Sequence, residues 1–230
     1  TTASAVVTEP DTLQASSVDV NPTCFEGNDG SIDPTVTGGL GPYLVSWDNG
    51  NNTAYISGLS AGTYNATIVD QNGCVYTYST ALADPNLVIP TVSADGPTIF
   101  CQGDSVTLTS SEADSYSWIP NGETTQSITV NEPGNYSVNV ITEDGCEGTS
   151  SAITVSIFQV DQATITADGP FEFCAGNQVN LTASEGSSYV WTPNGETSQS
   201  ITVSTSGNYS VTVVDENGCS DTVSAVVNEP

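Results

Sequence analysis

Carboxylates and thiols are the side chains of this sequence whose types could do chemistry. The chain has 27 Asp and Glu residues and six Cys, but no Lys, Arg or His. Nucleophilic catalysis at Ser, Thr or Cys needs a neighbouring base, and the usual ones, His and Lys, are missing. A carboxylate pair could still hydrolyse glycosides. The acids, however, stand in turn sequences such as those around Asp48 and Asp144, where turn formation explains them. We therefore predict that the chain is not an enzyme.

Clustered carboxylates could instead bind calcium, which prefers hard oxygen ligands. The first candidate site combines Asp29, Asp33 and Asp70. Further acidic pairs are Glu143–Asp144 and Asp215–Glu216, and none of these groups has the dense spacing of a known calcium loop. Calcium is therefore the one candidate cofactor, and no other is predicted.

The cysteines come in pairs at similar spacings of 50, 45 and 45 positions. A repeated pair in a chain without His favours disulfides over zinc, and it indicates an oxidising, extracytoplasmic setting. We predict that all six are oxidised: Cys24, Cys74, Cys101, Cys146, Cys174 and Cys219.

A sequence pattern repeats three times and organises the chain. A strand ending in Trp is followed by a turn with Gly, a Thr/Ser-rich strand, Gly-x-Tyr, and a final Gly-Cys. Two copies, residues 118–146 and 191–219, lie 73 positions apart without a gap, and a more distant copy spans residues 47–74. A repeated unit of this length predicts tandem modules.

The ends of the sequence also repeat each other. SAVVTEP at residues 4–10 reappears as SAVVNEP at residues 224–230, an offset of 220. Residues 1–10 are therefore predicted to be the last strand of a preceding module. The remaining predicted domains are 11–89, 90–160 and 161–230.

Alternating apolar residues predict short strands buried on one face, as at Val106 and Leu108. Helical periodicity is missing, so the fold class is all-β. A Trp on the third strand and a Tyr opening the sixth indicate immunoglobulin-like sandwiches. These aromatic residues are predicted to be buried rather than to bind sugars. Pro-bounded linkers and uniform negative charge predict an extended rod.

Two disulfide schemes remain open. Pairing within each module is the default, and each loop of 45 to 50 residues would contribute about 4 kcal/mol by the chain-entropy estimate. In an immunoglobulin topology, however, the first Cys of a module lies at one end of the sandwich and the second at the other, farther apart than a disulfide allows. A ladder between successive modules would instead join Cys24 to Cys146 and Cys101 to Cys219. Cys74 and Cys174 would then pair with neighbouring modules.

The formal net charge of −27 limits the partners of this chain. Nucleic acid and anionic lipid are repelled. No stretch reaches the 18 or more apolar residues of a membrane helix, so membrane insertion is not expected.

Residues 16–83 carry the sequence CFEGNDGSIDPTVTGG, then PYLVSWDNG, AGTY and DQNGC. This pattern resembles the SprB repeat of flavobacterial gliding adhesins, with one extra residue after Cys24. The second and third modules resemble immunoglobulin-like domains of Bacteroidota surface proteins. The resemblance implies export, through the type IX secretion system, to the cell surface, and a role in gliding motility or attachment.

Three short Asp-Ser/Thr-apolar motifs are similar to O-glycosylation acceptors of Bacteroidota. Their candidate acceptor residues are Thr12, Ser105 and Thr222.

Near-identical tandem modules favour a structural, spacing segment of a secreted cell-surface adhesin or filament. Its expected partners are neighbouring repeats of the same long chain. Two alternatives stay open: polysaccharide-binding modules of the adhesin, or an accessory stalk of a secreted enzyme. Exposed loop aromatics would favour binding.

Overall fold

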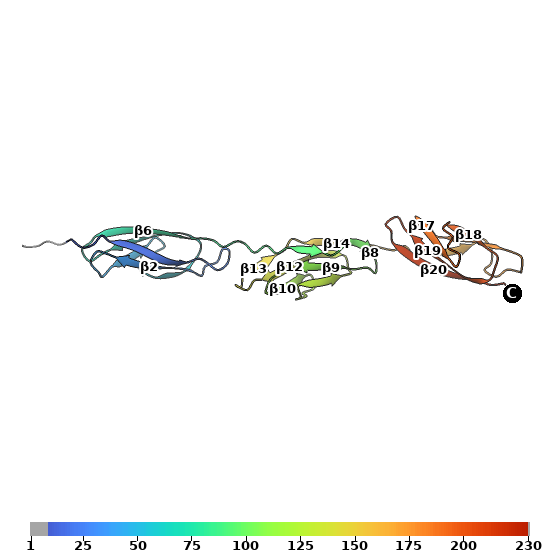
Figure 1. Ribbon diagram of the computed structural model, residues 1–230, viewed down its shortest axis with the longest axis horizontal. Coiled ribbons are helices and arrows are strands. Elements are labelled where there is room, and N and C mark those ends of the chain that lie inside the picture. The colour runs from blue at the N-terminus through green and yellow to red at the C-terminus, as the bar shows by residue number, and fades with distance from the viewer. Residues whose placement is uncertain (1–8, 230) are drawn as a thin grey trace, which may run out of the picture.

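A computed structural model describes residues 9–229, and the segment predicted as a preceding strand falls almost wholly outside this range. The described residues form three all-β modules arranged end to end in a rod (Figure 1). Residues 9–229 contain no helix, so none that could span a membrane. The predicted all-β rod is confirmed.

Twenty strands make up the described chain. In module one they are β1 (Gln14–Val20), β2 (Gly30–Thr37), β3 (Leu44–Trp47), β4 (Ile56–Leu59), β5 (Gly62–Val69) and β6 (Val75–Leu82). In module two they are β7 (Val92–Ala94), β8 (Ile99–Cys101), β9 (Val106–Ser110), β10 (Ser115–Ile119), β11 (Ser127–Val130), β12 (Gly134–Ile141), β13 (Glu147–Thr149) and β14 (Ile153–Phe158). In module three they are β15 (Ile165–Ala167), β16 (Val179–Ala183), β17 (Ser188–Thr192), β18 (Ser200–Val203), β19 (Gly207–Val214) and β20 (Ser220–Val227).

Module one is a sandwich of two three-stranded antiparallel sheets, β1-β2-β4 and β3-β5-β6. Strands one, two and four of the chain share one sheet, and strands three, five and six share the other. This is the strand order of an immunoglobulin sandwich without its fourth strand, D. The predicted immunoglobulin-like topology is therefore present.

Modules two and three keep this order with a divided first strand. In module two, β7 joins the β11-β9-β7 sheet, while β8 crosses over and pairs parallel with β14 of the β10-β12-β14-β8 sheet. Module three has sheets β15-β16-β18 and β17-β19-β20, with a single parallel bridge between Glu172 and Asn228 in place of the β8–β14 ladder.

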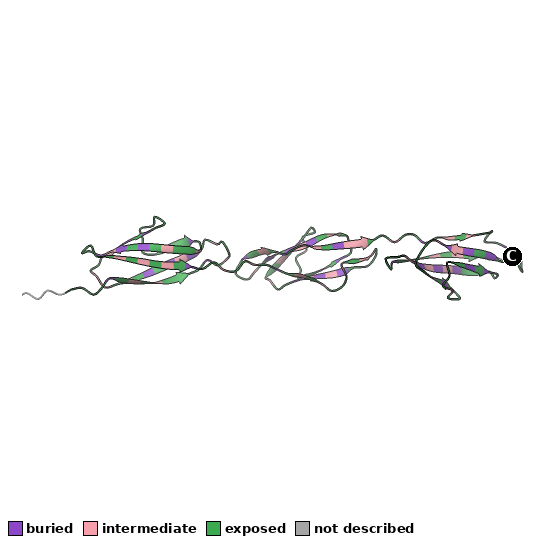
Figure 2. Cartoon of the chain, turned by 90° about the horizontal axis from the view of Figure 1, so that it is seen from above, coloured by how far each residue is buried: buried purple, intermediate pink, exposed green. Residues whose placement is uncertain are grey.

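Each sandwich encloses its own core around one Trp. Trp47, Trp118 and Trp191 are buried to 1–3 % exposure. Each indole N–H donates to a backbone carbonyl six or seven residues later, at 2.9–3.0 Å. The predicted burial of these residues is confirmed, and Figure 2 shows the underlying alternation of buried and exposed residues along the strands.

The Gly-x-Tyr elements form tyrosine corners in all three modules. The hydroxyl groups of Tyr64, Tyr136 and Tyr209 donate to the carbonyl group four residues upstream, at 2.8–3.1 Å. This bond fixes the loop that enters the strand carrying the Tyr. The sequence pattern predicts this Tyr on the sixth strand, but in module one it lies on the fifth, β5.

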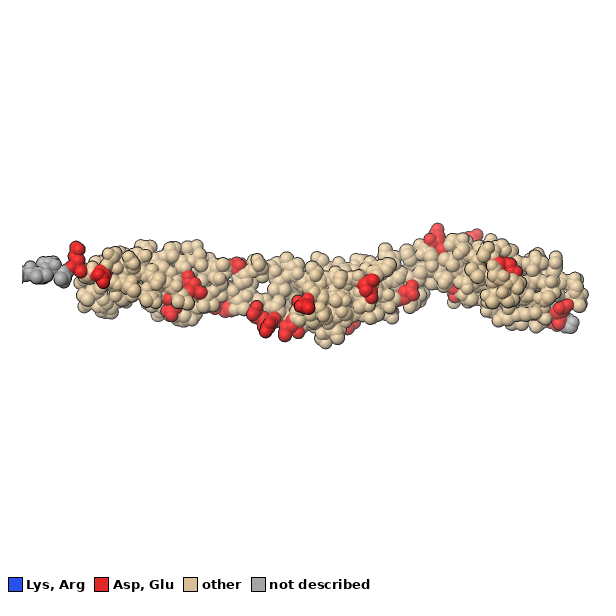
Figure 3. Space-filling model, in the orientation of Figure 1, with Lys and Arg blue, Asp and Glu red and all other residues tan. Residues whose placement is uncertain are grey.

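The carboxylates are scattered over the visible face of the rod, with no basic side chain among them (Figure 3). Several accept hydrogen bonds from backbone N–H groups. Asp95 accepts from Thr107 and Asp168 accepts from Asn180, at 2.8 and 2.9 Å. These bonds lower the pKa of both carboxyl groups, because they favour the charged form. They also hold the first strand where it leaves its sheet.

Candidate functional site at the module junctions

Disulfides cross both module junctions. Cys24 is bonded to Cys146 with their Cα atoms 5.4 Å apart, and Cys101 to Cys219 with theirs 5.5 Å apart. The structure thus has the ladder and not the pairing within modules. The end of each module that faces its predecessor is called its head, and the opposite end its tail.

The head of every module presents its second cysteine on the same backbone hairpin turn, and in module two Thr142 stands where the other modules have Asp. In module three, Oδ1 of Asp215 accepts from the backbone N–H groups of Asn217 and Cys219, at 2.8 and 2.9 Å. Asp70 does the same for Asn72 and Cys74 in module one. The hairpin therefore holds its cysteine in one orientation, before any partner is considered.

The tail of module one presents Cys24 on a loop between β1 and β2. Asp29 fastens this loop: its carboxylate accepts from the N–H of Thr23 at 2.8 Å and from the hydroxyl of Thr23 at 2.5 Å. The Thr23 hydroxyl is the main reason that the pKa of Asp29 lies below its ordinary value. The carbonyl oxygen of Thr23 also lies 3.5 Å from Sγ of Cys146. Asp29 thus positions the loop that carries the first disulfide.

The first linker, residues 83–90 between β6 and β7, runs closely along module two. The side chain of Val88 packs against the core of module two. At Gly148 on β13, an added Cβ would lie 2.4 Å from the carbonyl oxygen of Val88. Glycine is therefore needed there for the linker backbone to approach. On the other side, the N–H of Glu26 donates to Asp84 at 3.0 Å, which ties the linker to the Cys24 loop.

The tail of module two presents Cys101 on a strand instead of a loop. Cys101 ends β8, and its register partner on β14 is Phe158. The N–H of Gln102 extends this ladder by donating to the carbonyl of Phe158 at 3.0 Å. The bonded cysteine is thus held by the last strand of its own module, directly where the second linker begins.

The second linker, between β14 and β15, is held by a side-chain hydrogen bond. Asp221 on β20 accepts a hydrogen bond from the N–H of Ala163 at 2.9 Å. Asp221 stands 73 positions after Gly148, so the two occupy equivalent places. Ala163 is likewise equivalent to Pro90, which has no N–H to donate. The first junction therefore holds its linker by close backbone approach at Gly148, and the second holds its linker by a hydrogen bond to Asp221.

The structure does not bring the candidate calcium ligands together. Within residues 9–229, no group of three or more His, Cys, Asp or Glu side chains is placed to hold a metal ion. Asp29 lies at the tail of module one, whereas Asp70 lies at its head, where it accepts from the N–H of Leu40 at 3.0 Å. That bond lowers the pKa of Asp70 and occupies the carboxylate. Asp33 is exposed in the middle of β2.

The remaining sequence candidates lie on the surface. Cys74 and Cys174 are exposed and unbonded within the described chain. The candidate glycosylation residues Thr12, Ser105 and Thr222 are exposed as well. Their occupancy stays a prediction.

Three positioning residues were missed by sequence reasoning: Thr23, Gly148 and Asp221. Alignment of modules two and three at the 73-residue offset places Gly148 against Asp221 and so marks a difference, but strand alternation alone does not show that both face a linker. Thr23 carries no signal beyond its place beside Cys24.

Comparison with known proteins gives one family match: residues 16–52 match the SprB repeat. No curated protein matches the chain. Among solved structures, a bacterial ice-binding adhesin of 1.5 MDa shares 15 % identity over 94 % of this chain and 98 % of its own, with a TM-score of 0.43.

Two further solved structures have lower TM-scores. The eight N-terminal immunoglobulin domains of Down Syndrome Cell Adhesion Molecule share 16 % identity over 96 % of this chain and 36 % of their own, at 0.32. The SGBP-B protein of Bacteroides ovatus, solved with a mixed-linkage heptasaccharide, shares 15 % over 97 % and 71 %, at 0.22. Because these scores are low, the fold rests on the strand pairings. The family match is confined to module one, where residues 16–52 are similar to the SprB repeat.

Proposed function

We propose that this chain is a structural, spacing segment of a secreted cell-surface adhesin or filament that serves gliding or attachment. The observation that carries the proposal is the pair of disulfides that cross the two junctions. A disulfide within a module would stabilise that module alone, whereas these bonds join each module to the next. Such bonds fit a segment whose task is to keep its modules in line.

The setting follows from the same bonds. Disulfides form and persist in oxidising, extracytoplasmic compartments. The SprB repeat at residues 16–52 supports display on the cell surface. Export by the type IX secretion system, O-linked glycans at Thr12, Ser105 and Thr222, and contact with neighbouring repeats belong to the same proposal. The role is non-catalytic, since no His or Lys is present to act as a base.

The proposal is tested by location and by binding. Antibodies raised against the purified chain should label intact cells that produce it, without permeabilisation. The purified, oxidised chain should show no saturable binding on an array of surface polysaccharides. Labelling that requires permeabilisation would contradict surface display. Saturable binding that disappears on substitution of a loop residue would favour the polysaccharide-binding alternative over spacing.

A further inference from the structure

The two unbonded cysteines of the described chain lie at opposite ends of the rod. Cys74 is at the head of module one and Cys174 at the tail of module three. Their equivalents in the other modules are all bonded. The bonded head cysteines, Cys146 and Cys219, are 8 % and 1 % exposed, whereas Cys74 is exposed. A head cysteine with no module beside it would show this greater exposure.

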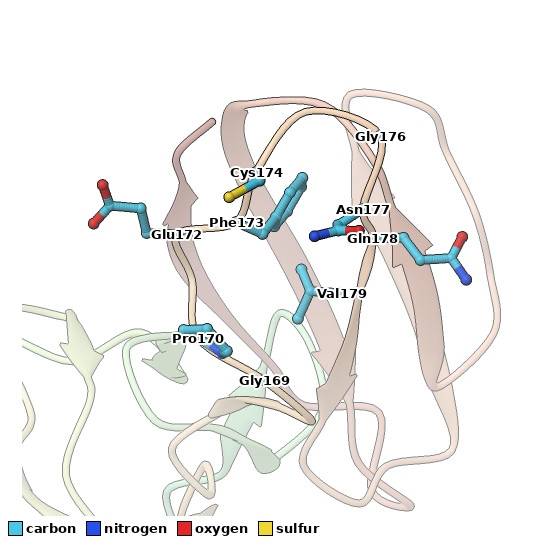
Figure 4. Close-up of a pocket in the computed structure, with 9 residues that line it drawn as sticks. All are labelled: Gly169, Pro170, Glu172, Phe173, Cys174, Gly176, Asn177, Gln178 and Val179. Carbon is cyan, nitrogen blue, oxygen red and sulfur yellow. The ribbon is translucent and has the colours of Figure 1, made fainter. Parts of the chain in front are cut away.

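The tail of module three has a cavity of about 640 Å³ beside Cys174. Figure 4 shows Cys174 and Phe173 next to each other on its wall, with Val179 below and Glu172 pointing away. Phe173 and Val179 are equivalent to Phe100 and Val106, which stand one position before and five positions after the bonded Cys101. The cavity therefore lies where the tail of module two receives the hairpin of module three.

The head of module one carries exposed apolar side chains around its hairpin. Leu44, Val69 and Val75 stand in one row across β3, β5 and β6, and Leu44 and Val75 are 74 % and 64 % exposed. The positions equivalent to Leu44 and Val75 are polar in the other modules: Ser115 and Glu147 in module two, and Ser188 and Ser220 in module three. The apolar row is thus specific to the head that has no neighbour within residues 9–229.

The sequence repeat gives an independent measure of the same junction. Residues 4–10 and 224–230 are related by an offset of 220, so a following copy would continue with Asp11 after Pro230. In that arrangement the next Cys74 lies 120 positions after Cys174. The two disulfides in the structure have sequence separations of 122 and 118. The sequence separation of a disulfide between Cys174 and the next Cys74 therefore lies between those of the two disulfides in the structure.

We propose that Cys174 forms a disulfide with Cys74 of a second copy of this chain, joined head to tail, with the apolar row around Cys74 packed against the tail of module three. The inference goes beyond the spacing role, because it stands on the disulfides and the repeat offset and holds whatever surface displays the chain. The ladder then continues from copy to copy without a break.

The bond forms by thiol–disulfide exchange. A thiolate of Cys74 attacks the disulfide of an oxidant such as oxidised glutathione, and one molecule of reduced glutathione leaves. The Cys174 thiolate then attacks the mixed disulfide and releases the second. The two cysteines lose two protons and two electrons, and the glutathione disulfide gains them.

The test uses one polypeptide in which Pro230 of the first copy is followed directly by Asp11 of the second. It is refolded in a glutathione redox buffer. The single chain should show two titratable thiols after denaturation, and the joined chain should also show two instead of four. Peptide mapping without reductant should recover a peptide that links Cys174 to Cys74 of the following copy. Four free thiols, or a different partner for Cys174, would overturn the proposal.

Matched variants check that the bond is specific. Cys174→Ser in the first copy should raise the thiol count to three and leave the other disulfides unchanged. Separate single chains carrying Cys74→Ser and Cys174→Ser should, when oxidised together, give the mixed dimer as well over half of all dimers. A statistical 1:2:1 distribution of the three dimers, the ratio that random pairing of equal thiols produces, would instead show adventitious oxidation of exposed thiols.

Discussion

The two module junctions make the same covalent bond from different backbones. On the head side the hairpin is alike in both. On the tail side, Cys24 stands on a loop held by Asp29, whereas Cys101 stands on β8 and is held by pairing with β14. The linkers also differ. At the first junction the backbone of Val88 passes close to Gly148, and at the second the N–H of Ala163 donates to Asp221. The junctions therefore share the cysteine positions and the head-side hairpin, whereas the tail-side structure differs.

Removal of the disulfides has the largest expected effect on both junctions. Each bond closes a loop of roughly 120 residues, for which the chain-entropy estimate is up to about 5 kcal/mol. Cys24→Ser with Cys146→Ser, and Cys101→Ser with Cys219→Ser, should each lower the melting temperature measured by calorimetry. Because β8 remains paired with β14, hydrogen exchange should rise more at the first junction. An equal rise at both would mean that β8 adds no local order.

Gly148→Ala should disturb the first linker. The added Cβ meets the carbonyl oxygen of Val88, so the linker or β13 has to move, and overpacking of this kind costs about 1–3 kcal/mol. Chemical denaturation of the oxidised chain measures the loss. Gly96→Ala is the matched control, because an added Cβ there contacts nothing within 4 Å. A similar loss in both variants would show that close approach at Gly148 does not matter.

Asp221→Ala should loosen the second linker, with a loss of about 1 kcal/mol from one hydrogen bond. Faster amide exchange at Ala163 is the direct measurement. Asp221→Asn keeps an acceptor oxygen and should retain most of the protection. If Asn behaves like Ala, the negative charge and not the hydrogen bond holds the linker.

Acidification should have the smallest effect on the first junction. The pKa of Asp29 is lowered in the folded chain, so its contribution to stability is complete above the unfolded pKa of about 3.9 and is lost as pH falls through the folded value. Amide exchange at Thr23, corrected for the intrinsic pH dependence, should rise in that acid range. Asp29 uses both of its oxygens as acceptors, and Asn can supply only one, so Asp29→Asn should show raised exchange already at neutral pH. If the pH profile of amide exchange at Thr23 were identical in the wild type and the variant, Asp29 would not hold the Cys24 loop.

The sequence was sufficient for the features that depend on local pattern. Alternation placed the strands, and the recurrence of Trp and Tyr placed the core and the tyrosine corners. The divided first strand of module two was not predicted, because Ile99 and Cys101 could extend either sheet and only the closure of the sandwich decides. The calcium hypothesis for Asp29 and Asp70 treated as neighbours two residues that lie at opposite ends of module one.

The disulfide pairing was left open for a related reason. Choosing between Cys74 and Cys146 as the partner of Cys24 requires the length of a sandwich and the rotation between modules, and neither is contained in residue spacing. The linker contacts of Gly148 and Asp221 depend on the same rotation.

The overlapping disulfides also decide how the rod would carry tension. Between its two ends, the shortest covalent path enters module two through Cys146, runs back along the chain to Cys101, and leaves through Cys219. Both linkers, and β2–β6 of module one, lie off this path. Only the 45 positions between Cys101 and Cys146 can lengthen under load between the two bonds. At roughly 3.5 Å per residue, that is about 160 Å at full extension. Under tension, module two would unfold between Cys101 and Cys146 while the two disulfides keep the modules connected.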